Sequence, residues 1–167
     1  MIIVINNFFT ETECNFWSTY CDYAINNDSL EVNLTTGGTS DKVNRNYYTL
    51  KSQYKFMDKV KQLAYKNWKQ NLYYQRGVYG HIMHYKDKGQ GLRWHSEPNI
   101  STVSCGINIS PSTEYKGANL EFKNSKLSVP YKALVMYDGY ELHRVTNLES
   151  GQKKSIVMWL QNKEQNK

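Results

Sequence analysis

Cysteine is scarce in this sequence, which has three such residues in 167, at Cys14, Cys21 and Cys105. An odd number leaves at least one thiol outside any disulfide. Cys14 and Cys21 lie seven residues apart in a predicted helix, where about 10 Å separates their Cα atoms, and a disulfide cannot span that distance. The simplest interpretation is a protein of a reducing compartment, which we expect to be the cytoplasm.

Long apolar runs are also missing. No stretch approaches the roughly 20 apolar residues that a membrane-spanning helix needs. The first residues, MIIVINNFF, lack the basic segment and the long apolar run of a signal peptide. We therefore expect neither a membrane partner nor a cleaved leader.

Charge of one sign is only slightly in excess. Lys and Arg number 21 against 15 Asp and Glu, a formal net charge of +6 that is spread along the chain. No dense Lys/Arg stripe is interleaved with aromatic residues, so the sequence does not favour a nucleic-acid partner, although it leaves one open. With 40% apolar residues, the composition predicts one globular domain over residues 1–167 and indicates no oligomeric state.

The N-terminal part combines an extended segment with two amphipathic helices. Residues 2–9 favour a strand, and Thr10 and Glu13 have the spacing of a capping box at the start of a helix. Residues 26–45 are polar and predict a loop. A second apolar stripe at helical spacing predicts a helix from about Tyr54 to Leu72.

After Gly77 the pattern changes to short apolar or alternating runs separated by Gly, Pro and Asn. Helices followed by such strands predict a mainly β, α+β fold: a cupin-like jelly roll (double-stranded β-helix) with the helices packed on one sheet. Residues 1–77 would supply the first strand and the supporting helices, and residues 78–161 the jelly-roll core. The predicted strands are 78–85, 101–109, 119–123, 133–137, 142–146 and 154–161.

Only four histidines occur, and two of them combine with a carboxylate. His95 and Glu97 are two residues apart, so on an extended strand their side chains leave the same face. With His143 they would form the two-His, one-carboxylate facial triad of non-haem iron oxygenases. A lone His-x-Glu is also common by chance, and a lone His is more often a packed or surface residue. The residues downstream therefore decide between these interpretations.

Lys153 follows His143 by ten residues and precedes the apolar segment that ends at Trp159. A buried cation there could bind a carboxylate through a charge-assisted hydrogen bond. Strand alternation sends Lys153 and Lys154 to opposite faces, so only one of them can enter the barrel.

In order and spacing, residues 78–161 resemble the prolyl-4-hydroxylase-like branch of the 2-oxoglutarate- and iron(II)-dependent dioxygenases. That branch carries His-x-Asp, a distal His and, about ten residues later, an Arg or Lys in a Gly-x-Arg/Lys setting ahead of an apolar strand with Trp. Gly151, Lys153 and Trp159 fit this last part. Upstream, the segment from Tyr85 through the Gly-rich turn is similar to the one that precedes the family's first His, and residues 115–120 are similar to the family's next hairpin.

Two positions depart from the usual pattern of the branch. Glu97 stands where Asp is usual, which keeps the charge and the oxygen ligand but adds a methylene. Lys153 replaces the commoner Arg, so a point charge replaces a two-pronged fork. Both departures are compatible with the same chemistry.

The resemblance implies an oxidoreductase that hydroxylates a C–H bond and decarboxylates 2-oxoglutarate to succinate and carbon dioxide. His95, Glu97 and His143 would bind Fe(II) as the catalytic centre, and Lys153 with Tyr85 would bind the 2-oxoglutarate co-substrate. Dioxygen would be the second co-substrate and ascorbate a reductant. The resemblance suggests peptidyl proline as the substrate, while another peptide side chain, a free amino acid or a small metabolite stays open.

Several further residues are candidates on position alone. His81 shares a strand face with Tyr85 and could line the pocket, and Asn108 could reach the co-substrate, although a solvent-facing position is the commoner case for such a residue. Arg93, Trp94 and Arg144 flank the expected ligands and could touch substrate. Residues 31–53 could form a lid, with a surface loop as the default.

Three other functions compete with the hydroxylase interpretation. A cupin-like metal-dependent isomerase or lyase would not need Lys153. A non-enzymatic binding module would need none of the metal ligands. A nucleic-acid demethylase of the same superfamily is kept open by the charge of +6, which speaks only to non-specific attraction.

Overall fold

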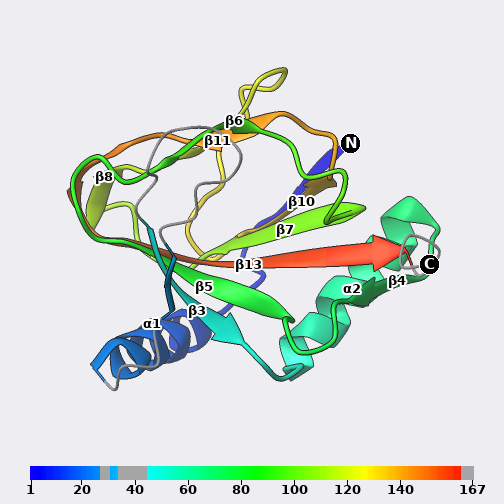
Figure 1. The fold of residues 1–167 in the computed structure, drawn as a ribbon, viewed down its shortest axis with the longest axis horizontal. Helices are drawn as coiled ribbons and strands as arrows, with labels where there is room; N and C mark the ends of the chain where they lie inside the picture. Colours follow the sequence, from blue (N-terminus) through cyan, green and yellow to red (C-terminus); the bar gives the residue numbers. More distant parts are fainter. Residues whose placement is uncertain (27–30, 34–44, 163–167) are drawn as a thin grey trace.

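The computed structural model describes residues 1–26, 31–33 and 45–162, which form a mainly β structure with two helices (Figure 1). The helices are α1 (Glu11–Asn26) and α2 (Lys55–Trp68). The strands are β1 (Ile2–Ile5), β2 (Glu31–Asn33), β3 (Arg45–Leu50), β4 (Leu72–Tyr74), β5 (Gly80–Tyr85), β6 (Leu92–His95), β7 (Val103–Asn108), β8 (Tyr115–Gly117), β9 (Leu120–Phe122), β10 (Leu134–Asp138), β11 (His143–Val145), β12 (Leu148–Gly151) and β13 (Lys153–Asn162).

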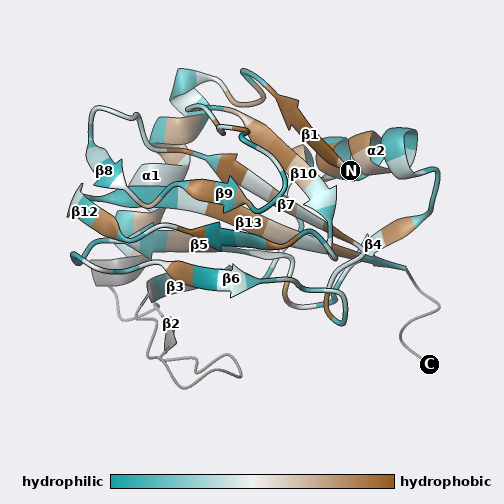
Figure 2. Ribbon diagram, turned by 90° about the horizontal axis from the view of Figure 1, so that it is seen from above, coloured by the Kyte–Doolittle hydropathy of each residue, from teal (hydrophilic) through white to brown (hydrophobic). Residues whose placement is uncertain are grey.

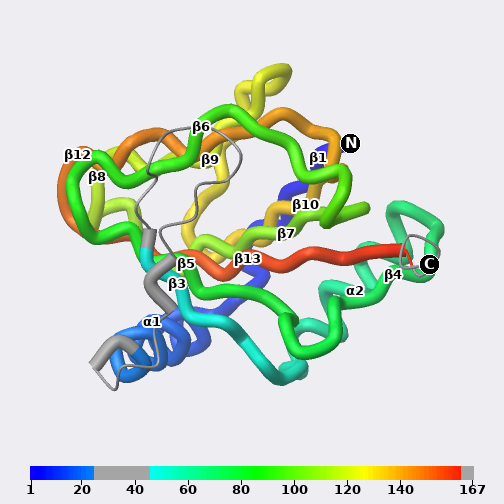
Figure 3. The backbone as a smooth tube through the Cα atoms, in the orientation of Figure 1, coloured from blue at the N-terminus to red at the C-terminus, as the bar shows by residue number. Residues whose placement is uncertain are grey.

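Antiparallel pairing joins the described strands into three sheets. The largest has eight strands in the order β1-β10-β7-β13-β5-β3-β2, with β4 also paired to β13. A three-stranded sheet has the order β6-β11-β9, and β12 pairs with β8. The tube in Figure 3 shows β13 running beside β5 and β7 through the middle of the large sheet, whereas β6 and β9 lie in a second layer.

Both helices pack on one face of the large sheet, as predicted. The main hydrophobic cluster joins Trp17 of α1 and Val60 of α2 to buried residues of β5, β7, β10 and β13. Figure 2 shows apolar segments in α2 and β10, both of which contribute buried residues to this core. The opposite face of the large sheet is therefore left to face the second layer.

The start of α1 has the predicted capping box. The backbone N–H of Thr10 donates to Glu13 Oε2 at 2.7 Å, and the N–H of Glu13 donates to Thr10 Oγ1 at 3.2 Å. The end predicted for the second helix, at Leu72, is wrong. The helix α2 stops at Trp68 because Lys69 adopts the left-handed conformation with φ 57°, and Leu72 begins strand β4.

Two other predicted boundaries also need correction. The first strand ends at Ile5, because Asn7 has a φ of 51° and turns the chain before Phe8. The polar region 26–45 is not all loop, since β2 and the start of β3 lie in it and extend the large sheet. The N-terminal residues 1–77 therefore supply four strands of that sheet in addition to the helices.

The six strands predicted after Gly77 are all present, within three residues of their predicted ends. Cys14, Cys21 and Cys105 are buried free thiols. Among the described residues, neither helix has the length and apolar character needed to cross a membrane.

Candidate metal centre

A pocket opens on the face of the large sheet that the helices leave uncovered. Its walls come from β5, β7, β10 and β13 of the large sheet and from β6, β9 and β11 of the second layer. Most of its lining is apolar, and its polar groups include His95, Glu97, Asn108, His143 and Lys153. An apolar cavity with a few convergent polar groups is the usual form of a small-molecule site.

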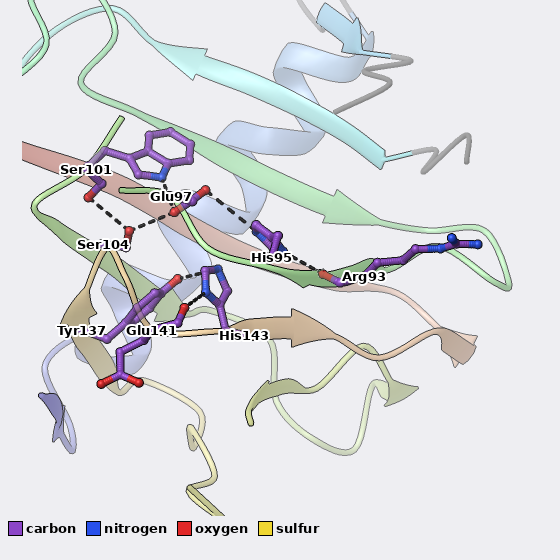
Figure 4. A network of polar contacts seen from close by, with 9 residues as sticks. Arg93, His95, Glu97, Ser101, Ser104, Tyr137, Glu141 and His143 are labelled. Atoms are coloured by element: carbon purple, nitrogen blue, oxygen red, sulfur yellow. Dashed lines mark hydrogen bonds and ion pairs between the residues drawn. The ribbon is translucent and has the colours of Figure 1, made fainter. Parts of the chain in front are cut away.

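Strand pairing brings two of the predicted ligands together. The antiparallel register of β11 and β6 places His143 directly opposite His95, and their ring centroids lie 4.2 Å apart. Glu97 follows β6 by two residues and turns toward the same point (Figure 4). One ligand atom from each of the three residues lies within 4.8 Å of those of the other two, as metal ligands require.

Backbone carbonyls orient both imidazoles. His95 Nδ1 lies 2.7 Å from the Arg93 carbonyl oxygen, and His143 Nδ1 lies 2.8 Å from that of Glu141. Since a carbonyl only accepts, each Nδ1 carries the proton and each Nε2 keeps its lone pair. This arrangement orients a histidine as a metal ligand through Nε2.

The Glu97 carboxylate is held by one of its two oxygens. Ser104 Oγ donates to Oε2 at 2.8 Å, and Trp159 Nε1 donates to the same oxygen at 2.9 Å. The other oxygen, Oε1, lies 3.9 Å from His95 Nε2. The two donors thus turn Oε1 toward the histidines.

Tyr137 completes the surroundings of the two histidines. Its hydroxyl lies 3.2 Å from His143 Nε2, which accepts the hydroxyl proton in this tautomer. Burial, with smaller effects from nearby acidic groups, holds the pKa of Tyr137 well above its usual value, and burial lowers the pKa of His143. A neutral His143 is the protonation state that metal binding needs.

The donor set fits a divalent metal. Two imidazole nitrogens and one carboxylate oxygen on a single side leave other coordination positions for small ligands, which is the facial arrangement found with non-haem iron(II). His143 is 3% exposed, whereas the His95 and Glu97 side chains are 31% and 14% exposed. The site is therefore reachable from the pocket while one ligand is fully enclosed.

Lys153 enters the pocket, and Lys154 leaves it, as the alternation predicted. Lys153 Nζ donates to the Ala118 carbonyl oxygen at 2.5 Å and lies 5.2 Å from the centre of the Tyr115 ring. Burial lowers the pKa of Lys153 to about 8. Lys154 Nζ instead meets Asp22 Oδ1 of α1 at 2.6 Å, on the helix side of the sheet.

The remaining candidates divide into those that line the pocket and those that do not. Tyr85 and Asn108 line it. Asn108 is 4% exposed, so the solvent-facing position that was the commoner expectation is wrong. Its amide Nδ2 donates to Tyr115 Oη at 3.2 Å. His81 lies on the same face of β5 as Tyr85 and packs against Trp159.

Arg144 and Trp94 point away from the metal ligands. The Arg144 guanidinium stacks 4.8 Å from the Trp94 ring and pairs with Glu121 at 2.7 Å. With Arg93 they line a separate groove on the outer side of the second layer, so the structure does not bring them into the pocket. The proposed lid at 31–53 lies partly outside the described residues, and its described parts are β2, β3 and the turn into α2.

Three residues of the site were missed in the sequence. Neither Ser104 nor Tyr137 was a candidate from the sequence, and Trp159 was identified only as the end of an apolar strand. Their alternation with the buried core positions of β7, β10 and β13 was the available signal, because it puts them on the pocket face.

No protein-family model matches the chain. A segment of 63 residues is 38% identical to a PKHD-type hydroxylase of Hyphomonas neptunium. That match covers 35% of this chain and spans only 28% of the length of the relative.

Solved structures share the fold over nearly the whole chain. A prolyl-4-hydroxylase of Pseudomonas putida aligns over 97% of this chain and 92% of its own, with a TM-score of 0.71 and 12% identity. A Trichoplax adhaerens prolyl hydroxylase in complex with a hypoxia inducible factor peptide fragment aligns over 98% and 84%, with a TM-score of 0.72 and 12% identity. A viral collagen prolyl hydroxylase of Paramecium bursaria Chlorella virus-1, in its 2OG complex, aligns over 96% and 95%, with a TM-score of 0.65 and 11% identity.

These comparisons confirm the resemblance that the motifs indicated. For the solved structures the likeness is one of fold, that of the three prolyl hydroxylases. For the curated relative it is one of sequence over the matched segment.

Proposed function

We propose that this chain is an iron(II)- and 2-oxoglutarate-dependent oxygenase that hydroxylates a C–H bond in a peptide or amino-acid-like substrate. The observation that carries the proposal is the convergence of His95, Glu97 and His143 in a pocket that also holds the buried Lys153. The known proteins that it resembles are hydroxylases and oxygenases, which supports the same reaction class. We also propose that the two β layers form a double-stranded β-helix and that the chain is a single domain.

Each residue has a distinct part in the proposed reaction. His95, Glu97 and His143 would hold Fe(II), which when bound supplies the oxidative chemistry with dioxygen. Lys153 stands at the start of β13, and Trp159, which contacts Glu97, stands toward its end, so the pocket has a cationic end and a metal end. The ammonium of Lys153 would bind the distal carboxylate of 2-oxoglutarate, with Tyr85 and Asn108 as neighbours.

The apolar lining of the pocket keeps water away from the bound co-substrate. Met83, Val135 and Val157 lie between the two polar ends of the lining. A charge-assisted contact gains strength in such surroundings, because the local dielectric constant is low. Ascorbate remains part of the proposal only as an external reductant.

Release of succinate from 2-oxoglutarate tests the proposal. The purified chain would be incubated with Fe(II), 2-oxoglutarate and a panel of proline-containing peptides, other peptides and free amino acids. We expect succinate release that one substrate class stimulates and that His143→Ala abolishes. Equal succinate release by the parent protein and His143→Ala, or none from the iron-loaded parent across the panel, would contradict the proposal.

A further inference from the structure

A row of side chains crosses the large sheet on its pocket face. The strand registers place Thr49 opposite His81, Trp159 opposite Ser104, and Ser104 opposite Tyr137. Trp159 lies diagonally across from His81 between β13 and β5, a separation that aromatic side chains bridge. The row therefore runs through five neighbouring strands, in the order β3, β5, β13, β7 and β10.

Contacts link the first half of this row to a metal ligand. Thr49 Oγ1 lies 3.2 Å from His81 Nδ1. The His81 ring meets the Trp159 ring edge to face, with centroids 5.0 Å apart and an interplanar angle of 70°. Trp159 Nε1 then donates to Glu97 Oε2 at 2.9 Å.

We propose that His81 is a positioning residue of the metal centre, which acts on Glu97 through the indole of Trp159. The inference rests on the proposed function, because it requires a metal at Glu97. Trp159 is only half-buried, and the torsion that turns an indole is broad. The edge-to-face contact with His81 therefore restricts the rotation of the indole and keeps its N–H on Oε2.

Loss of the contact between His81 and the indole would change the orientation of one metal ligand, Glu97. Without the indole N–H, Oε2 keeps the hydrogen bond from Ser104 Oγ, and Oε1 is less firmly directed toward the histidines. Loss of a hydrogen-bond partner of a metal ligand typically weakens metal affinity by about 10- to 100-fold. His81 contacts Trp159 and not Glu97 itself. Removal of His81 should therefore weaken metal affinity less than removal of the indole N–H does.

Co(II) binding to the metal-free protein tests the inference without any turnover. The affinity is read from the visible absorption of bound Co(II) in the parent, His81→Ala, Trp159→Phe and the double variant. We expect Trp159→Phe to weaken binding by at least about tenfold and His81→Ala by about three- to tenfold. In the Trp159→Phe background, His81→Ala should not weaken Co(II) binding further, because the indole N–H through which His81 acts is already absent.

Two further variants separate positioning from a general loss of structure. His81→Phe restores a ring against Trp159 and should recover most of the affinity. His84→Gln is the matched control on the opposite face of β5, where His84 contacts Gln152, and it should bind Co(II) like the parent. Thermal unfolding of each variant checks that the protein stays folded.

The outcomes test the role of His81 separately from the existence of the metal centre. Unchanged affinity in His81→Ala, or an equal loss in the parent and Trp159→Phe backgrounds, would overturn the role of His81 while leaving the metal centre in place. A parent protein that binds no Co(II) would instead overturn the metal centre on which the proposed function depends.

Discussion

At the scale of single residues, the proposed centre depends on which atoms are already occupied. The Nδ1 atoms of His95 and His143 are each bonded to a backbone carbonyl, and Oε2 of Glu97 has two donors. The three groups directed at one another are two Nε2 atoms and one carboxylate oxygen, and a metal would replace the Tyr137 hydroxyl as the partner of His143 Nε2. Metal binding should therefore depend both on the three ligands and on the hydrogen-bond partners that orient them.

We expect His95→Ala and His143→Ala each to abolish stoichiometric iron binding, since each removes one of three protein ligands. Metal analysis of the reconstituted protein measures this. His84→Gln should keep full iron occupancy, because His84 lies on the helix side of β5. Full occupancy in either ligand variant would disprove the proposed triad.

Glu97→Asp should bind iron more weakly than the parent, whereas Glu97→Ala should not bind it measurably. The shorter side chain keeps a carboxylate but withdraws it from the donors Ser104 and Trp159, which are placed for a glutamate. A loss of about tenfold or more is expected for such a partner change. Competition with a metal chelator would measure it, and parental affinity in Glu97→Ala would rule out this residue as a ligand.

Lys153 gives the co-substrate site a defined dependence on pH. Burial lowers the pKa of this ammonium to about 8 in the ligand-free protein. Above that pH the lysine is neutral and must take up a proton to bind a carboxylate, so 2-oxoglutarate affinity should fall by up to about tenfold per pH unit. Lys153→Arg, whose guanidinium stays charged, should show a flat profile over pH 7 to 9.5. Parallel profiles for the two proteins would contradict the assignment.

Burial of Lys153 should lower the free energy of unfolding of the protein. The fall in pKa from 10.5 to about 8 corresponds to roughly 3 kcal/mol of unfavourable free energy at neutral pH. Between pH 8 and 10.5 the unfolded chain binds a proton that the folded chain does not, so stability rises with pH in this window. Lys153→Met should therefore raise Tm at pH 7 by a few degrees, and the difference should shrink as the pH rises. A lower Tm for Lys153→Met at pH 7 would contradict this.

At the scale of elements, the capping box at the start of α1 should contribute to the stability of the fold. The capping box between Thr10 and Glu13 satisfies backbone N–H groups at the helix start. Thr10→Ala should lower the free energy of unfolding by about 1 kcal/mol. Urea unfolding measures the change, while iron binding should stay parental because α1 packs on the face away from the pocket.

Strands with strong alternation could be predicted from the sequence, and short or polar ones could not. The strand β13 alternates between core and pocket residues over ten positions, which predicted that only one of Lys153 and Lys154 enters the pocket, while the resemblance to the family selected Lys153. The strand β6 has only four residues, too few for a period to show. The strand β3 lies in the segment 31–53, for which a surface loop was the default expectation, but Asn46 and Thr49 are buried within the sheet.

The metal ligands could be predicted because their chemistry is rare in the sequence, whereas their supports could not. Two of only four histidines and one nearby carboxylate make a recognisable set. Ser104 and Tyr137 are common residue types, and only the register of β7, β10 and β13 shows that they meet these ligands. Such cross-strand proximity depends on tertiary pairing, which no local pattern contains.

At the scale of the whole molecule, the two faces of the large sheet differ in what they contact. One face packs against α1 and α2 in the main core, and the other faces the pocket. The net charge of +6 is spread along the sequence, and a nucleic-acid partner, which this pattern does not favour, stays an open prediction. A cytoplasmic location and the identity of the substrate stay predictions, and the succinate assay addresses the second.

The most direct test of the central claim is an oxygen-free titration of 2-oxoglutarate into the iron(II)-loaded protein, followed by the metal-to-ligand absorption band. We predict a saturable band with one equivalent of 2-oxoglutarate in the parent, none in His143→Ala, and an affinity at least about a hundredfold weaker in Lys153→Ala, as expected when one partner of a buried charge pair is lost. A parent protein that binds iron but develops no band, or a Lys153→Ala variant that titrates like the parent, would contradict the account.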